Sequence, residues 1–346
     1  MSPAGAGAGR ASDEPCLVTG ASGFIGGRLA ERLAREGHPV RALVRPTSDT
    51  ARLETLDVEI LRGDLSDPAS LQRAAAGARH VLHCAALVTD WATSREIRQT
   101  NVEGTRMMLD AAAGASVEHF IHLSTTDVYG HPGGRAVDED FQGDGGFGNW
   151  YTHTKRQAER EVQDAHAAHR LETVILRPAT VYGPGSAEVI GQIARAIQGG
   201  NMLLVDRGRA VAGLCYVDNL LDAAMIALRH EAAPGNAFNV SDGLAVTWKQ
   251  LTGDLAADLG CREVRWSIPY PLAGAIGFSL EHGYRLLRSG TGLSTPALLS
   301  RQAVQVLGRD QDFSARKLRE TLGWEPRVDY PAGLRATLEW LEAEYL

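Results

Sequence analysis

A glycine-rich segment near the N-terminus constrains the fold of this chain more than any other feature. It reads V-T-G-A-S-G-F-I-G-G over residues 18–27, between an apolar strand predicted for 16–18 and a helix with apolar Leu29 and Leu33. Glycine permits positive φ and close phosphate approach, and a helix N-terminus offers unpaired N–H groups. The spacing alone is a weak signal, but the flanking strand and helix indicate a dinucleotide site. Cofactor contacts are expected from Gly20, Ser22, Gly23, Phe24, Ile25 and Gly26.

Further strand ends follow along the chain. Strands are predicted for residues 40–44, 58–61, 80–83, 120–123 and 173–176, with helix-length segments between them, as right-handed βαβ crossovers require. Ligands collect at the carboxyl ends of such strands. We therefore expect Asp64 to accept a hydrogen bond from the adenine amino group, although Asp is also common in turns. Neighbouring cofactor contacts are expected from Leu65, Ala85 and Ala86.

The end of the second strand bears on the choice of cofactor. NAD-binding folds usually carry a carboxylate there for the ribose hydroxyls, whereas a basic group accommodates the 2′-phosphate of NADP. Between His38 and Ser48 the charged residues are Arg41 and Arg45, and no carboxylate occurs. The sequence therefore favours NADP(H) over NAD(H), with Arg45 as the phosphate contact. The alternative is that Arg45 is a solvated strand end and that Asp49 reaches the ribose.

A tyrosine and a lysine lie four residues apart at the start of a helix predicted from residue 150 to about residue 169. Tyr151 and Lys155 therefore share one helix face. Free tyrosine has a pKa of about 10, and a nearby ammonium favours the phenolate, which makes Tyr151 a candidate general acid or base. Such a pair in isolation is usually a chance surface pair. The preceding nucleotide loop and the hydroxyl cluster at 124–126 favour the catalytic interpretation.

Taken together, these motifs resemble the extended short-chain dehydrogenases/reductases, and the resemblance covers nearly the whole chain. They include T-G-x-x-G-x-x-G at 19–26, V-Y-G at 128–130, Y-x-x-x-K at 151–155 and R-P-x-x-V-Y-G-P at 177–184. The downstream segments are similar to the 3β-hydroxysteroid dehydrogenase and ketoreductase branch. The resemblance implies a cofactor contact at Pro178 and a catalytic tetrad whose matching residues are Asn101, Thr125, Tyr151 and Lys155.

Several chemistries share this tetrad within the family. Sugar 4,6-dehydratases carry Asp-Glu directly after the catalytic Thr, where this chain has Thr126 and Asp127. Many nucleotide-sugar epimerases carry an Arg that holds the diphosphate, where this chain has the apolar segment 211–214. We therefore expect an oxidoreductase that transfers hydride between nicotinamide and a largely apolar ketone or secondary alcohol. A nucleotide-sugar epimerase and a non-catalytic cofactor sensor are the alternatives. The residues that could instead grip a phosphate are Arg207, Arg209 and Arg301.

The predicted fold is α/β, a Rossmann-type doubly wound parallel sheet with a smaller, interleaved C-terminal substrate lobe. Residues 1–14 are expected to be a disordered tail, 15–185 mainly the dinucleotide-binding domain, and 186–346 mainly the substrate lobe, with segments returning to the Rossmann core. The segment 271–287 is an unusually apolar helix, for which buried packing is the default, a lid the second and an interfacial membrane contact the third interpretation. Substrate contacts are expected from Val88, Trp91, Asp127 and Tyr182.

Composition excludes other classes of protein. A formal net charge of -7 argues against nucleic acid as a partner. No apolar run reaches the roughly 18 residues of a spanning helix, and the N-terminus lacks an apolar signal region, so a cytoplasmic location is expected. The histidines lack the spacing of a metal site, and we expect no metal. The expected partner is a lipophilic small molecule, while a homodimer and a peripheral membrane contact remain open.

Overall fold

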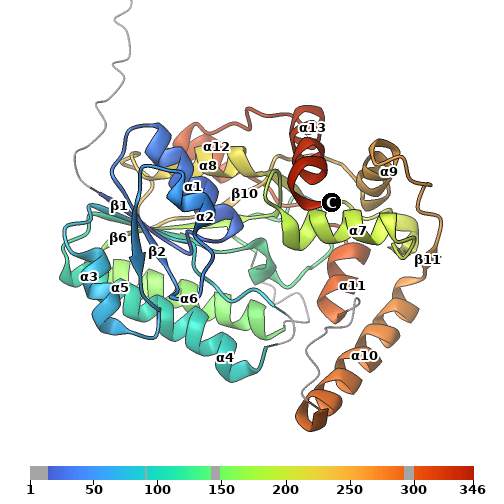
Figure 1. Ribbon diagram of the computed structural model, residues 1–346, viewed down its shortest axis with the longest axis horizontal. Coiled ribbons are helices and arrows are strands. Elements are labelled where there is room, and N and C mark those ends of the chain that lie inside the picture. The colour runs from blue at the N-terminus through green and yellow to red at the C-terminus, as the bar shows by residue number, and fades with distance from the viewer. Residues whose placement is uncertain (1–14, 90–91, 142–148, 292–299) are drawn as a thin grey trace, which may run out of the picture.

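A seven-stranded parallel sheet forms the centre of the computed structural model, which describes residues 15–89, 92–141, 149–291 and 300–346, the backbone alone over 281–291 (Figure 1). The strand order is β3-β2-β1-β4-β5-β6-β10. The predicted Rossmann-type α/β fold is confirmed. The strands are β1 (Cys16–Thr19), β2 (Val40–Val44), β3 (Glu59–Arg62), β4 (His80–His83), β5 (His119–Leu123), β6 (Glu172–Pro178) and β10 (Ala237–Val240).

Helices cover both faces of the sheet because its strands are apolar on both faces. Cys16 and Val18 point to one face and Leu17 to the other, and each face has its own core. The first face is covered by α1 (Phe24–Arg35), α8 (Val217–Ala227) and α12 (Arg316–Leu322). The second face is covered by α3 (Pro68–Ala75), α5 (Gly104–Gly114) and α6 (Trp150–Ala167).

The strand order reverses between β1 and β4, which lie side by side with Cys16 opposite His80. The first three strands run outward from β1 in one direction, and the later strands run outward from β4 in the other. In open α/β sheets, ligands bind in the crevice at the carboxyl ends of the strands at this reversal. The loops after β1, β4 and β5 therefore surround the expected site.

The second half of the chain contributes to both the sheet layers and a separate lobe. Helices α8 and α12 and strand β10 belong to the sheet layers, and Phe238 of β10 lies in the same core as Val18. The division at residue 185 remains a prediction. The lobe contains β7 (Thr180–Tyr182), η3 (Ala187–Gly191), α7 (Gln192–Gln198), β8 (Leu204–Val205), η4 (Asp206–Gly208), β9 (Leu214–Tyr216), α9 (Trp248–Asp258), β11 (Ser267–Ile268), α10 (Tyr270–Thr291), α11 (Arg301–Gly308), α13 (Tyr330–Trp340) and η5 (Leu341–Tyr345).

Helix α10 corrects the expectation of buried packing for the apolar segment 271–287. The helix extends away from the body of the molecule and packs beside α11 (Figure 1). Ala273 is fully buried, but Leu272 and Phe278 are 51% and 49% exposed. Over the part of α10 whose side chains are described, 270–280, the side that carries Ala273 and Gly277 is the packed one: a Cβ at Gly277 would lie 3.3 Å from the Ser300 carbonyl oxygen. Its apolar composition did not indicate this exposure.

Candidate active site

Small residues bring the ends of β1 and β4 together at the reversal of the sheet. Gly20 has a φ of +68°, and a Cβ there would lie 2.8 Å from the Cα of Ala85. A Cβ on Gly26 would collide with the carbonyl oxygen of Gly20. The amide of Ala85 donates to the hydroxyl of Thr19 at 3.2 Å. Helix α1 begins directly after this turn with no acidic residue in its first turn, so the backbone forms a cradle that fits a dinucleotide pyrophosphate.

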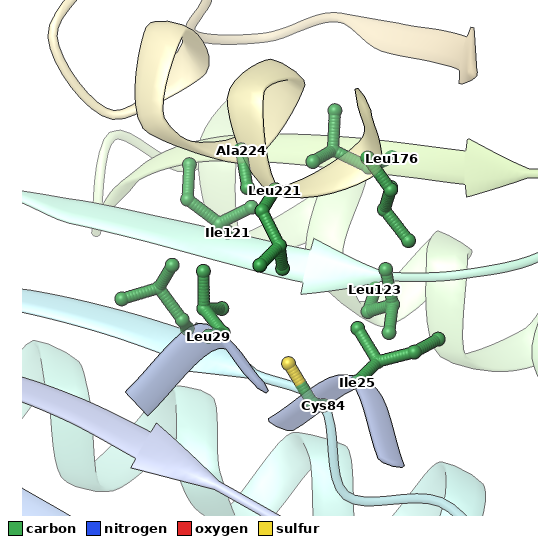
Figure 2. A pocket seen from close by; sticks show the side chains of 10 residues that line it. Ile25, Leu29, Cys84, Ile121, Leu123, Leu176, Leu221 and Ala224 are labelled. Atoms are coloured by element: carbon green, nitrogen blue, oxygen red, sulfur yellow. The ribbon is translucent and has the colours of Figure 1, made fainter. Parts of the chain in front are cut away.

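The other predicted residues of the glycine loop have different surroundings. Ser22 is exposed and its hydroxyl donates to that of Ser48 at 3.2 Å, which joins the loops after β1 and β2. Phe24 opens α1 and lies against Gly185. Ile25 instead lines a small apolar cavity between α1, α8 and the sheet, together with Cys84 (Figure 2). Its contact with a cofactor would therefore come from its backbone at the helix N-terminus.

The loop after β3 forms a turn. The carboxylate of Asp64 accepts from the amide and the hydroxyl of Ser66, at 2.9 and 2.6 Å, and these hydrogen bonds lower the pKa of Asp64. This geometry matches the turn-forming alternative for Asp64. Leu65 packs against α5, where a Cβ on Gly104 would lie 2.9 Å from the Leu65 Cβ. Pro178 is buried and is the last residue of β6, so the strand extends two residues beyond the end predicted at 176.

The edge formed by β2 and β3 presents two arginines. Arg45 is exposed directly after β2. Arg62, the last residue of β3, donates from Nη1 to the carbonyls of Pro46 and Ser48 at 3.1 and 3.3 Å and so holds the loop after β2. The carboxylate of Asp49 accepts from the Ala51 amide at 3.0 Å. Arg62 was not among the predicted cofactor residues, although its place directly after the strand predicted for 58–61 was a usable signal.

Tyr151 and Lys155 lie on the buried side of α6, and the side chain of Lys155 reaches the end of β5. They are 8% and 2% exposed. Lys155 Nζ donates to the carbonyl of Leu123 at 2.7 Å, directly before the hydroxyl cluster that contains Thr125. Burial lowers the pKa of Lys155 to about 8, and the charge of Glu159 opposes this shift. An ammonium is thereby placed at a strand end beside a candidate catalytic hydroxyl.

Thr125 caps the short helix that follows β5. Its Oγ1 accepts from the amide of Asp127 at 3.1 Å, which leaves the hydroxyl proton of Thr125 to be donated to a ligand. Asn101 lies in a π-helical turn (Gln99–Glu103) between α4 (Ser94–Arg98) and α5. Its amide bonds both the N–H and the C=O of Leu87, at 2.7 and 3.1 Å, and Thr154 Oγ1 at 3.3 Å. Asn101 thus fastens the loop after β4 to the helix that carries Lys155.

The predicted substrate residues do not all meet at this site. Val88 is 69% exposed on the loop after β4, and Trp91 lies outside the described residues. Asp127 accepts from Gln302 Nε2 of α11 at 2.7 Å and so connects the end of β5 to the lobe. Tyr182 is fully buried, with its ring 5.3 Å from that of Tyr216. Tyr182 thus packs in the lobe core, and its expected contact with the substrate remains a prediction.

A buried ion pair missed by the sequence analysis fixes α6 against the sheet. Glu159 accepts from Arg177 Nε and Nη2 at 2.9 and 2.7 Å, and Arg177 Nη1 donates to Tyr129 Oη at 2.8 Å. Burial disfavours the Arg177 cation, but the hydrogen bonds and charge of Glu159 outweigh it, so the pKa of Arg177 is raised. The sequence feature that could have indicated a buried Glu159 is its spacing of four from Lys155 and eight from Tyr151, which places the three residues on one helix face.

Metal-binding clusters and membrane-spanning helices are both absent from the described part of the chain. Among those residues, no group of three or more His, Cys, Asp and Glu side chains is arranged to hold a metal ion. No helix over the same residues is long and apolar enough to cross a membrane.

The phosphate cradle and the tyrosine–lysine pair on a Rossmann sheet define a nicotinamide-dependent enzyme of the short-chain dehydrogenase/reductase class, one that acts on C=O or CH–OH groups. Residues 16–241 match the model of the NAD dependent epimerase/dehydratase family. The chain belongs to this family, as the sequence analysis expected.

Similar proteins agree with this assignment. A 2-alkyl-3-oxoalkanoate reductase of Stenotrophomonas maltophilia (strain K279a) is 32% identical, over 92% of this chain and 97% of the relative. A 4-hydroxy-2-methyl-3-oxo-4-farnesyl-3,4-dihydroquinoline-1-oxide ketoreductase of Stigmatella aurantiaca is also 32% identical, over 92% of this chain and 94% of that protein. The solved structure of MoeE5 in complex with UDP-glucuronic acid and NAD superposes with a TM-score of 0.74 at 25% identity, covering 95% of this chain and 99% of MoeE5.

Proposed function

We propose that this protein is an NAD(P)-dependent ketoreductase that reduces a largely apolar ketone to a secondary alcohol, and that the same residues serve the reverse oxidation. The observation that carries this proposal is the hydrogen bond of Lys155 Nζ to Leu123 at the end of β5, two residues before Thr125, from the same buried helix face as Tyr151. The two reductase relatives, each similar over nine tenths of the chain, support the same reaction class.

Each residue of the site has a role in this reaction. The nicotinamide supplies the hydride when the cofactor is bound. Tyr151 gives its phenolic proton to the substrate oxygen, and Thr125 donates a hydrogen bond to the same oxygen. Lys155 presents its ammonium to the cofactor ribose and favours the phenolate of Tyr151. Asn101 holds the loop after β4 against α6, and we assign the lobe formed mainly by 186–346 to the substrate, which the Asp127–Gln302 hydrogen bond supports.

An apolar substrate is favoured by what the lobe lacks. Gly213 has a φ of +61°, and any Cβ there would collide with the backbone of Gln311, so a basic side chain cannot replace it to hold a diphosphate. Leu214 is fully buried, Arg207 and Arg209 are exposed, and the guanidinium of Arg301 lies over the ring of Phe278, 5.5 Å from its centroid. Burying the charge of a pyrophosphate in a closed site without basic partners would cost binding free energy. By contrast, each methylene of an apolar substrate that is buried in the site contributes about 0.8 kcal/mol to binding. The names of both reductase relatives denote oxo compounds with alkyl or farnesyl chains.

A substrate panel tests this proposal. We expect NADPH to be consumed with a 2-alkyl-3-oxoalkanoate or another long-chain ketone and not with UDP-, GDP- or dTDP-sugars, with product identified by mass spectrometry. Conversion of a nucleotide sugar to its epimer without net use of cofactor would replace the ketoreductase with the epimerase alternative. Cofactor binding without turnover of any panel member would favour the non-catalytic sensor.

The finer choice of cofactor is NADP(H), bound at its 2′-phosphate by Arg45. The exposed guanidinium of Arg45 and the loop fixed by Arg62 support this assignment, as does the engagement of Asp49 with the Ala51 amide. A charge-assisted hydrogen bond contributes about 1.5 to 3 kcal/mol, or about tenfold and more in affinity. Replacing Arg45 by Asp is therefore expected to reverse the preference in calorimetric titrations with NADPH and NADH.

Arg41→Ala is the matched control for Arg45→Asp. Arg41 lies in β2, the strand that Arg45 follows, but its guanidinium donates to Glu59 at 2.9 Å and to the carbonyl of Ala76. We expect this variant to keep the affinities of the parent protein for both cofactors. Tighter binding of NADH than of NADPH by the parent protein would contradict the assignment.

A further inference from the structure

The lysine at the candidate active site has a histidine as its neighbour. Lys155 Nζ lies 3.2 Å from Nε2 of His122 and 2.7 Å from the carbonyl oxygen of Leu123. Both partners come from the end of β5, and Lys155 and His122 are 2% and 1% exposed. The nearest carboxylate on the same helix face, Glu159, is already engaged by two nitrogens of Arg177. The described partners of the Lys155 ammonium are therefore uncharged.

The ring of His122 also contacts a second histidine, His83, besides Lys155. It stacks on His83, with ring centroids 5.6 Å apart. The nitrogens of His83 lie 2.9 Å from Thr19 Oγ1 and 3.1 Å from Thr105 Oγ1, so His83 is itself fixed between β1 and α5. A continuous row of buried polar side chains thus runs from the strand before the phosphate cradle to Lys155. Such a row fixes rotamers before any ligand binds.

We propose that His122 is a positioning residue for Lys155: its neutral ring accepts one ammonium hydrogen at Nε2, Leu123 accepts a second, and the third is left for the cofactor ribose or Tyr151. The importance of this arrangement for catalysis rests on the proposed function. The arrangement itself concerns only residues of this chain and can be tested in the protein without cofactor.

The protonation states allow two arrangements, and they can be separated. Burial, together with the charges of Lys155 and His83, holds the pKa of His122 well below its usual value, so the ring is neutral and carries one proton. Our proposal places this proton on Nδ1, which has no hydrogen-bond partner among the described residues. The opposite arrangement places it on Nε2, and Lys155 must then be a neutral amine that accepts it. The other titratable groups that face this pair are Cys84 and Glu159.

Removing the ring shifts the titration of Lys155 in opposite directions in the two arrangements. An acceptor stabilises the ammonium, so its loss lowers the pKa of Lys155, whereas the loss of a donor to the amine raises it. A hydrogen bond to a charged group contributes enough to move the pKa by about one unit or more. The chain has three lysines, Lys155, Lys249 and Lys317, so NMR of lysines labelled with ¹³C at Cε resolves the titration of Lys155 with two internal references.

In the apoprotein we expect Lys155 to titrate near pH 8, and about one unit or more lower in His122→Leu. His122→Gln, whose side-chain oxygen reaches the position of Nε2, is expected to remain close to the parent protein. Should His122→Leu fail to fold, His122→Asn provides a second variant, because its polar atoms reach only the position of Nδ1. An unchanged or raised pKa of Lys155 in His122→Leu or in His122→Asn would overturn the proposal.

His119→Leu is the matched control, because His119 lies on the same strand but stacks on His80, with ring centroids 5.3 Å apart, and not on the lysine side. We expect it to leave the titration of Lys155 unchanged. In assays with a reducible ketone, the alkaline limb of kcat should move to lower pH in His122→Leu and stay in place in His122→Gln and His119→Leu. If the parent protein reduces no ketone, the proposed function fails while the lysine titration still decides the role of His122.

Discussion

Tyr151→Phe is expected to lower kcat for ketone reduction by about a hundredfold to ten-thousandfold, because it removes the group that protonates the substrate oxygen. The change deletes one oxygen from a side chain that is 8% exposed and keeps its aromatic ring. Cofactor affinity should therefore remain near that of the parent protein. Stopped-flow measurement of NADPH oxidation, together with calorimetric titration of the cofactor, separates the loss of chemistry from a loss of binding.

Tyr182→Phe is the matched control for this variant. Tyr182 is fully buried, and its hydroxyl has no hydrogen-bond partner among the described residues, so the same deletion should leave turnover unchanged. Full turnover in Tyr151→Phe would exclude Tyr151 as the proton donor. A large loss of turnover in Tyr182→Phe would instead support the predicted contact of Tyr182 with the substrate.

Local patterns predicted the elements that local chemistry determines. The turn at Gly20 and the helix that follows require glycine at fixed positions within one βα unit, and both are where the sequence indicated them. The spacing of Tyr151 and Lys155 likewise fixed a shared helix face before any tertiary contact was known. These features depend on a few neighbouring residues, so a single sequence contains the information they need.

Contacts between distant segments could not be predicted in the same way. Arg62 reaches the loop after β2 only because β2 and β3 pair in the sheet, and His122 meets Lys155 only because β5 and α6 pack together. The sequence also cannot show what covers an apolar surface. It predicted burial for helix α10, whose Leu272 is half exposed.

Glu159→Ala is expected to destabilise the protein by about 3 to 5 kcal/mol, because it leaves the buried guanidinium of Arg177 without its carboxylate. The two side chains are 6% and 11% exposed and are joined by two hydrogen bonds. Tyr129 remains as a partner, but a phenol does not compensate a buried cation. Urea-induced unfolding of the apoprotein measures the change in the free energy of unfolding.

Asp110→Ala is the matched control, since Asp110 also pairs with an arginine, Arg170, at 2.6 Å, but the two side chains are 56% and 45% exposed. Solvent screens such a pair, and its loss should cost about 1 kcal/mol or less. Equal costs in the two variants would show that the Glu159 pair is no more than a surface contact.

A double variant, Glu159→Leu with Arg177→Met, should recover most of the lost stability, because apolar side chains of similar volume leave no charge to solvate. Because Glu159 lies one turn after Lys155 on the face that also carries Tyr151, the double variant further tests whether α6 needs the ion pair itself, or only dense packing, to hold Lys155 at the end of β5. Loss of the Glu159 charge by itself lowers the pKa of Lys155, so cofactor affinity at neutral pH is the measurement that reports on its position. Unchanged cofactor affinity in a stable double variant would assign that task to packing.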